Sequence, residues 1–299
     1  MELSDLRFFE SVARLGGMNK AAVELNTVQS NVTARIRALE HELGVALFHR
    51  HSRGVELTKA GFRLLPYASK AAWVLAEAKR AVLDQGVPSG RLALGSLETT
   101  ASLRLSPVIT RFSLAHPAVD ISLRVGPNQV LKQQILDHAL DGAFVCAPVE
   151  HPDIISEPVF REELVIAQAV TAGLADAPLA SGCKILVKAP GCAYRDRLIH
   201  LLESERVSNY TTMEFGTLDA IIGCVEAGLG ITMLPRSLLV AAERSGRVRL
   251  QALPQRVAAV DTIFIRRRDA LEFSGMKAFL GILREEAARA SLANTPEAA

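Results

Sequence analysis

Short polar side chains gather in one stretch near the N-terminus, between residues 29 and 37. They are Gln29, Ser30, Asn31, Thr33 and Arg37. A Gln side chain can bond an adenine in two places, Ser or Thr can pair with several base edges, and Arg can neutralise a phosphate. If one helix presents these side chains together, its first turns are suited to enter the major groove of a DNA duplex.

Two helical patterns are spaced to position this polar face. Their apolar residues are Ala21, Ala22 and Leu25 in the first, and Val32, Ile36, Leu39 and Leu43 in the second. Only residues 26–28 separate the patterns, and Asn26 tolerates the left-handed backbone that such a turn often needs. At 100° per residue, Gln29 and Arg37 fall well away from the apolar face, whereas Arg35 falls elsewhere and suits a phosphate or a surface ion pair. The pattern predicts a helix-turn-helix.

A basic segment broken by glycine follows, with the sequence LFHRHSRGVELT at residues 47–58. Arg50 and Arg53 lie between two short runs, which predicts a two-stranded wing whose tip meets phosphates or a narrow minor groove. Periodicity alone leaves an alternative open, because an ordinary small helical bundle with solvated charges has the same spacing.

Three consecutive motifs carry a family resemblance through residues 1–61. They are F-x-x-V-x-x-x-G-x-x-x-x-A-A-x-x-L, Q-S-x-V-T-x-x-I-x-x-L-E-x-x-L-G-V-x-L-F-x-R and L-T-x-A-G. This pattern resembles the LysR-type transcriptional regulators, which implies a winged helix-turn-helix DNA-binding domain over residues 1–58. Two residues depart from the family: Val28 replaces a capping Ser, so Thr27 is expected to cap the helix, and Ala34 replaces a longer polar residue.

Composition sets limits on the class of protein. The chain has 299 residues, which suggests about two domains, and its net charge of +2 does not by itself indicate a nucleic-acid binder. Four cysteines lie far apart without a C-x-x-C motif, which argues against a zinc ribbon or a disulfide framework. The N-terminus resembles no signal peptide, and no apolar run is long enough to span a membrane. We therefore expect a reduced cytoplasmic protein with no metal and no cofactor.

Residues 58–85 form a long Ala-rich helical pattern. Its apolar seam comprises Leu64, Ala68, Ala71, Leu75, Ala78 and Val82. A helix of this length exceeds what a small domain needs for its own core, so it should pair with a second copy of the chain. The linker helix and hinge are expected over residues 59–90, where the segment QGVPSG ends them.

The rest of the chain, residues 91–299, alternates strand and helix patterns. This order predicts α/β layers, and about 200 residues suggest two lobes with a cleft between them. The resemblance implies a two-lobe effector domain like a periplasmic binding protein, with lobe I at about 91–164 and 266–299 and lobe II at about 165–265. The complete fold class is then α+β multidomain, with the chain crossing near residues 165–168 and returning near residues 265–268.

Polar residues follow three of the predicted strands. They are Ser96, Thr99 and Thr100, then Asn128 and Gln129, then Cys192, Tyr194 and Arg195. Each has a purely structural interpretation, such as a helix cap or a surface charge. Together, at strand ends facing one cleft, they predict a site for an anionic or polar small-molecule effector.

These observations favour a ligand-responsive transcription regulator over two other classes. It would form a homodimer through residues 58–85 and a homotetramer, bind an inverted repeat in double-stranded promoter DNA, and have RNA polymerase as a candidate partner. An enzyme is disfavoured because no G-x-S-x-G, H-E-x-x-H or Walker-type motif is present. A solute-binding receptor would lack the first 90 residues and carry a signal peptide. A redox switch at Cys183 and Cys192 is a further alternative, disfavoured because the surrounding residues do not match the peroxide-sensing branch.

Overall fold

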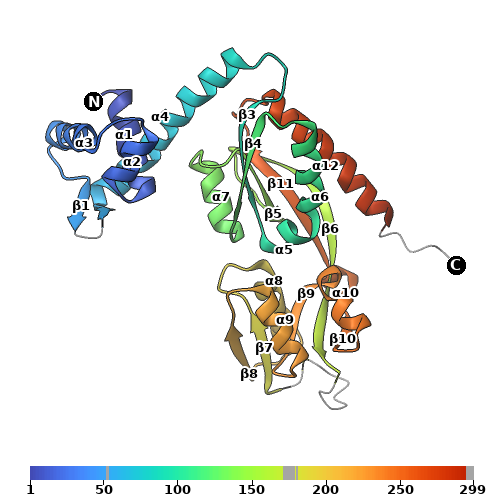
Figure 1. Ribbon diagram of the computed structural model, residues 1–299. Coiled ribbons are helices and arrows are strands. Elements are labelled where there is room, and N and C mark those ends of the chain that lie inside the picture. Colours follow the sequence, from blue (N-terminus) through green and yellow to red (C-terminus); the bar gives the residue numbers. More distant parts are fainter. Residues whose placement is uncertain (52–53, 171–178, 180, 294–299) are drawn as a thin grey trace. The chain divides into compact units, whose positions relative to one another are not determined.

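The computed structural model describes residues 1–51, 54–170, 179 and 181–293 (Figure 1). The chain divides into two compact units. The first comprises residues 1–87 together with 136–139 and 270–273, and the second comprises the remainder.

Three helices form the body of the first unit. They are α1 (Leu3–Leu15), α2 (Met18–Glu24) and α3 (Gln29–Leu43). Asn26 adopts a positive φ of 50° in the turn between α2 and α3, as its short polar side chain allows. Of the expected apolar face of the second helix, Val32, Ile36 and Leu39 are buried, whereas Leu43 in the last turn is 38% exposed.

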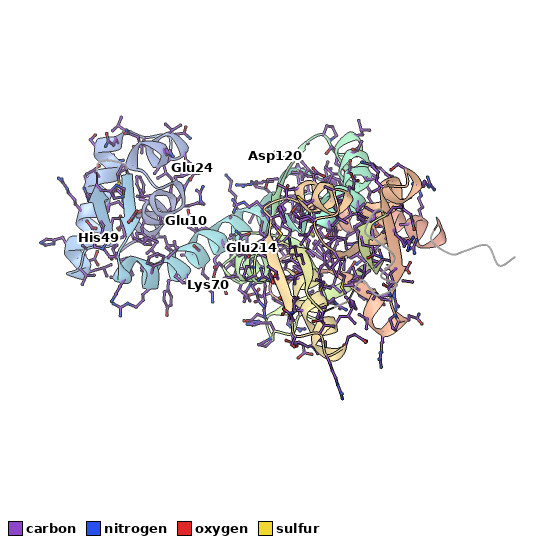
Figure 2. The ribbon with its side chains drawn as sticks, turned by 90° about the horizontal axis from the view of Figure 1, so that it is seen from below. Glu10, Glu24, His49, Lys70, Asp120 and Glu214 are labelled. Atoms are coloured by element: carbon purple, nitrogen blue, oxygen red, sulfur yellow. The ribbon has the colours of Figure 1, made fainter. Side chains whose placement is uncertain are left out.

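A charged network ties α1 to α2. Arg14 on α1 donates from Nε to Glu10 at 2.9 Å and also pairs with Glu24 of α2, while the Ser11 hydroxyl donates to Glu24 at 2.9 Å. Figure 2 labels both carboxylates on these helices. Behind them, the rings of Phe9 and Phe48 lie 5.2 Å apart.

The predicted wing is present as two antiparallel strands, β1 (Phe48–His51) and β2 (Gly54–Leu57). Helix α4 (Lys59–Leu83) follows, with Thr58 as its N-cap: the Thr58 hydroxyl accepts a hydrogen bond from the Gly61 amide at 3.1 Å. The expected apolar seam divides along its length. Leu64, Ala68 and Ala71 pack on the core of the first unit, whereas Leu75 and Val82 are 44% and 82% exposed.

The first lobe of the second unit is built on five strands with helices beside them. Its strands are β3 (Gly90–Ser96), β4 (Val119–Val125), β5 (Gly142–Cys146), β11 (Ala259–Arg267) and the first part of β6 (Ile154–Ala169). Its helices are α5 (Glu98–Thr100), a π-helical segment (Ala101–Leu105), α6 (Ser106–Ala115), α7 (Asn128–Leu136) and α12 (Ser274–Ala293). Strand β3 runs parallel to β4 and β5, whereas β11 is antiparallel to β5 and β6, so the sheet is mixed. Phe112 of α6 and Phe279 of α12 pack edge to face, 5.5 Å apart.

The second lobe uses the end of β6 with further strands and helices. Its strands are β7 (Cys183–Val187), β8 (Tyr210–Glu214), β9 (Thr232–Pro235) and β10 (Val248–Ala252). Its helices are α8 (Ala193–Ser204), α9 (Leu218–Glu226) and α10 (Arg236–Arg244). Strands β9 and β10 both pair with β6 after residue 163, and β7 pairs in parallel with β8.

The chain crosses between the lobes close to the expected place on the way out, whereas its return differs from the expectation. Strand β6 pairs with β11 up to Glu163 and with β9 from Leu164, so the first crossing lies at these two residues. Because all of β11 pairs with β6 and β5, the return occurs before residue 259, through the short helix α11 (Gln255–Ala258), and not near residues 265–268. Among the helices that the structure describes, none has both the length and the apolar character needed to cross a membrane.

Candidate functional site

The first candidate site is the outer face of α3. Gln29, Ser30, Asn31 and Arg37 are exposed, and Thr33 is half-buried. The opposite face holds the buried residues Val32 and Ile36, so the packing of α3 leaves the predicted base-reading side chains open to a partner. Four of these five side chains lie in the first two turns, where a recognition helix approaches base edges.

The start of α3 differs from the expectation that Thr27 caps it. The N-cap residue is Val28, and no side chain caps the helix there. The Thr27 hydroxyl instead accepts a hydrogen bond from the Asn31 side-chain amide at 2.9 Å. Because the side chain of the N-cap residue is apolar, the first-turn N–H groups have no side-chain cap and suit an anion such as a phosphate.

The arginines near α3 divide into two environments. Arg35 pairs with Asp5 of α1 at 3.0 Å and lies over the ring of Phe8, so it forms the ion pair that its position on the helix suggested. Arg50 on β1 lies 3.3 Å from Glu40 and is 37% exposed, which leaves part of its guanidinium accessible. Arg53 lies outside the residues that the structure describes.

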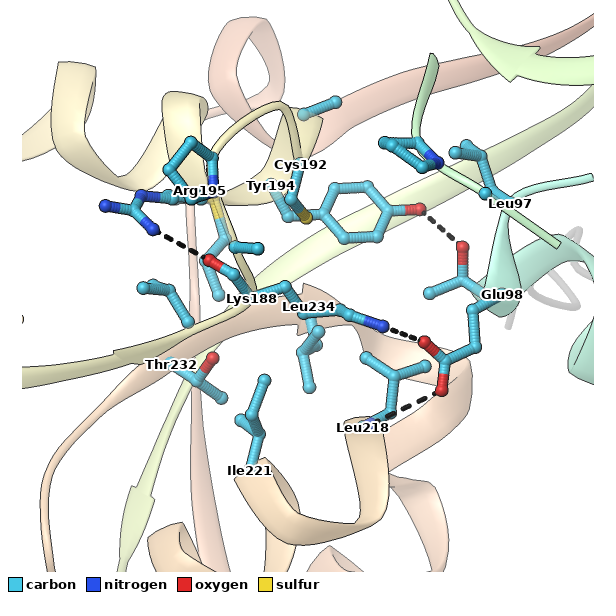
Figure 3. Close-up of a pocket in the computed structure, with 18 of the residues that line it drawn as sticks. Leu97, Glu98, Lys188, Cys192, Tyr194, Arg195, Leu218, Ile221, Thr232 and Leu234 are labelled. Atoms are coloured by element: carbon cyan, nitrogen blue, oxygen red, sulfur yellow. Dashed lines mark hydrogen bonds and ion pairs between the residues drawn. The ribbon is translucent and has the colours of Figure 1, made fainter. Parts of the chain in front are cut away.

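The second candidate site is a cavity of about 230 Å³ in the second unit (Figure 3). Its wall comes from both lobes and is mostly apolar. The apolar lining includes Leu97, Val125, Val187, Leu218, Ile221 and Leu234, and the polar lining is Glu98, Thr99, Lys188, Cys192, Tyr194, Arg195 and Thr232. A mostly apolar cavity with a few convergent polar groups is typical of a small-molecule site.

Two polar contacts join the lobes across this cavity. The hydroxyl groups of Thr99 and Tyr194 lie 3.2 Å apart, and both side chains are buried. The Lys188 amine pairs with the Glu98 carboxylate, whose other oxygen lies 3.5 Å from the amide nitrogen of Leu218 at the start of α9. Figure 3 marks both contacts with dashed lines. Burial raises the pKa of the Tyr194 phenol, so this group stays protonated and available as a hydrogen-bond donor.

Arg195 does not reach freely into the cavity. Its Nη1 donates to the backbone carbonyl of Lys188 at 2.9 Å and to the Glu214 carboxylate at 2.8 Å. The Arg195 side chain thereby holds the loop after β7 against the end of β8. Both cationic side chains in the lining, Lys188 and Arg195, are therefore already paired with carboxylates.

Of the eight predicted effector residues, the structure brings Thr99, Cys192, Tyr194 and Arg195 together around the cavity. The other four lie elsewhere. Ser96 is fully buried and donates to the carbonyl of Leu97, and Thr100 is buried behind the lining. The Asn128 side chain bonds both backbone groups of Cys146 at 2.9 Å, and Gln129 is exposed.

Sequence reasoning missed the charged pair in the cavity. Glu98 lies inside the polar segment GSLETT, and Lys188 follows the strand KILV directly, so both occupy strand-end positions like those that were chosen. Thr232, which donates to the Leu186 carbonyl at 2.7 Å, was hidden within a strand pattern. Opposite charges at two strand ends were the signal that could have identified Glu98 and Lys188.

The cysteines offer little support for a thiol switch. All four are free, and burial raises the pKa of the thiols of Cys146 and Cys183, which disfavours the reactive thiolate. Cys192 lines the cavity as a small polarisable wall residue.

Comparison with known proteins matches both units of the chain. Residues 3–62 match the bacterial regulatory helix-turn-helix protein, lysR family, and residues 85–288 match the LysR substrate binding domain. The chain is 40% identical over 291 residues to the HTH-type transcriptional regulator GltR of Bacillus subtilis, which covers 95% of this chain and 97% of the relative. It is 44% identical over 280 residues to the uncharacterised regulator YusT of the same organism, covering 94% of each.

Solved structures agree on the fold. A full-length variant of OxyR from Pseudomonas aeruginosa superposes with a TM-score of 0.73 at 20% identity, covering 96% of this chain and 94% of that one. Full-length CbnR in complex with its target DNA superposes with a TM-score of 0.51 at 24% identity, covering 96% of this chain and all of that one. With its two domain matches and its full-length relatives, this chain belongs to the LysR family of DNA-binding transcriptional regulators, with an N-terminal helix-turn-helix and a C-terminal effector-binding domain.

Proposed function

We propose that the chain reads an inverted repeat in promoter DNA as a dimer of dimers, and that a small molecule in the cavity of the second unit controls this binding. The observation that carries the proposal is the cavity itself, because residues of both lobes close it through Thr99–Tyr194 and Glu98–Lys188. A ligand that enters between these contacts binds open and closed arrangements of the lobes with different affinity. Only such a difference lets a ligand shift a conformational equilibrium.

DNA contact is assigned to the outer face of α3 and to the wing. Gln29, Ser30 and Thr33 would meet base edges, and Asn31, Arg37, Arg50 and Arg53 would contact the phosphate backbone. The exposed positions on α3 and the uncapped start of that helix support this assignment. The structure of the relative CbnR with its target DNA gives a precedent within the same fold.

Pairing of two chains is assigned to α4. Leu75 and Val82 are exposed on a helix of 25 residues and lie seven residues apart, which is the spacing of a coiled-coil seam. A second copy of α4 would cover them in a coiled coil. Pairing would also double the number of recognition helices, which a protein of nearly neutral net charge needs for affinity.

We expect the chain to act through binding and not through catalysis, in the manner of its relatives, which are transcription regulators. A gel-shift experiment with DNA from beside its own gene tests the proposal. The full-length chain should retard the intact inverted repeat, and shifting one half-site by half a helical turn should abolish the retardation. Equal retardation of both fragments would contradict dimeric recognition.

A further inference from the structure

Two side chains of opposite charge, Glu98 and Lys188, pair with each other in the lining of the cavity. Glu98 comes from the first lobe and Lys188 from the second, and their side chains are 33% and 26% exposed. Each charged group faces the cavity and neutralises the other (Figure 3). The second cation, Arg195, is held by Glu214 and by the carbonyl of Lys188. The lining thus offers one carboxylate and one ammonium group that have only each other as charged partners among the described contacts.

This pairing disfavours a ligand that carries a single charge. A simple carboxylate that binds Lys188 must displace Glu98, which leaves the Glu98 carboxylate without its cation in a mostly apolar cavity. A simple amine that binds Glu98 leaves Lys188 in the same position. An unpaired charge in apolar surroundings is costly. A ligand with a single charge therefore loses much of the binding free energy that its new ion pair supplies.

A ligand with both charges avoids this cost. Its ammonium group takes the place of Lys188 beside Glu98, while its carboxylate takes the place of Glu98 beside Lys188. Every charge then keeps an opposite partner. The cost of opening the original pair is offset, because two new pairs of opposite charge replace it.

The remaining lining defines the body of the ligand. Leu97, Val125, Val187, Ile221, Met233 and Leu234 surround the charged pair with apolar surface. The cavity volume of about 230 Å³ lies below the roughly 300 to 1,000 Å³ of sites for drug-sized ligands, so the ligand is small. Given that the cavity is the effector site, as proposed above, we infer that Glu98 and Lys188 select a zwitterionic aminocarboxylate with an apolar side chain.

Calorimetry on the full-length chain tests this selection with two matched trios. The first is L-leucine, 4-methylpentanoate, which lacks the ammonium group, and 3-methylbutylamine, which lacks the carboxylate. The second is L-phenylalanine, 3-phenylpropanoate and 2-phenylethylamine. At least one amino acid should bind roughly tenfold or more tightly than both of its analogues, since each analogue loses a charge-assisted hydrogen bond and leaves a partner unpaired.

Two mirror-image variants sharpen the test. Glu98→Gln replaces the carboxylate that pairs with the ammonium group by a neutral amide, so the preference should shift from the amino acid to the acid analogue. Lys188→Gln removes the ammonium group that pairs with the ligand carboxylate, so the preference should shift from the amino acid to the amine analogue. Glu226→Gln is the control, because it removes an ion pair with Arg247 on the second lobe, and Glu226 is not part of the cavity lining. This control should keep the preference of the unaltered chain.

Three outcomes overturn the inference: in both trios an analogue that binds the unaltered chain as tightly as its amino acid, no binding by either amino acid, or unchanged preference in both mirror-image variants. Promoter binding is measured by gel shift on the same preparation. If the chain binds promoter DNA and one of these outcomes is found, the inference about the ligand is overturned and the proposed DNA binding is not. A preparation that fails to bind promoter DNA contradicts the proposed function, whatever the calorimetry shows.

Discussion

The hydroxyl groups of Thr99 and Tyr194 lie 3.2 Å apart across the cavity, although the two residues belong to different lobes. Thr99 is in the short helix α5 after β3, and Tyr194 is in the first turn of α8 after β7. Only 5% and 7% of their surfaces are exposed, so water does not compete effectively for this bond. The contact is a buried hydrogen bond that joins the two lobes.

Replacing Tyr194 by Phe should change how stability depends on pH. Burial raises the pKa of Tyr194 above its ordinary value of 10.0, so the unfolded chain loses this proton first as pH rises. The free energy of unfolding should therefore stay constant with respect to this group below about pH 10 and fall above it. Tyr194→Phe should reduce that fall, while costing about 1 kcal/mol at neutral pH through the lost hydrogen bond.

Urea unfolding at about pH 7 and about pH 10.5 checks both effects. Tyr67→Phe is the matched control, because Tyr67 is 72% exposed. An equal loss of stability at high pH in the unaltered chain and in Tyr194→Phe would contradict the role given to this phenol.

Gln29→Ala should relax base preference at one position of the DNA site. Gln29 is exposed in the first turn of α3, where its amide can bond one adenine in two places. The loss should be about 1 to 3 kcal/mol on the cognate site and close to zero on a site with that base pair changed.

Arg35→Ala is the comparison variant on the same helix. Its ion pair with Asp5 is partly exposed, so its removal should lower stability by less than about 1 kcal/mol and leave base preference intact. Gel-shift titrations over a set of single-base substitutions measure both variants. A uniform loss over all sites in Gln29→Ala would assign Gln29 to the DNA backbone instead.

Gly61→Ala should destabilise the first unit. A Cβ atom at Gly61 would lie 2.3 Å from the carbonyl oxygen of Leu47 and 2.8 Å from a methyl carbon of Leu57. Helix α4 would have to move away from the wing, at a cost of about 1 to 3 kcal/mol. Gly281→Ala in α12 meets no atom within 4 Å and should be neutral or stabilising by up to about 1 kcal/mol. Thermal unfolding compares the two, and equal melting temperatures would contradict the close packing at Gly61.

Charges placed on the exposed part of α4 should separate the proposed dimer. In Leu75→Glu/Val82→Glu, two carboxylates per chain would face their symmetry copies in the paired helix, which is unfavourable in a coiled-coil seam. Sedimentation should show a shift toward monomer, together with weaker binding of the full inverted repeat. Val23→Glu is the control, since Val23 is 79% exposed on α2. Unchanged sedimentation of the double variant would assign pairing to another surface.

Local sequence patterns predicted the helices of the first unit, whereas they did not predict which strands distant in the chain pair with each other. The spacing of Val32, Ile36 and Leu39 defined α3 because burial of a helix face depends on residues three and four apart. Strand β10 was not predicted, since it forms by pairing with β6, about 80 residues earlier in the chain. The return between the lobes was predicted too late in the chain for the same reason. The segment VDTIFIR, residues 260–266, has the pattern of a buried strand and would fit either lobe.

The residues predicted for the cavity likewise include some that line it and some that do not. Thr99 and Tyr194 were identified because polar residues after strands tend to meet at one edge of a sheet. Asn128 satisfies the same rule, yet its amide is committed to the backbone of Cys146, and this choice depends on the position of β5. Sequence spacing predicts where side chains gather and does not say which hydrogen bonds they form.

Strand β6 gives the effector-binding unit a particular mechanical character. One unbroken run of 16 residues serves first as a neighbour of β11 and then as a neighbour of β9 and β10. Because no loop interrupts β6 between the lobes, a rotation of one lobe relative to the other would bend this strand near Glu163 and Leu164. The stiffness of strand β6 then sets how much binding free energy a small molecule must supply to move one lobe relative to the other.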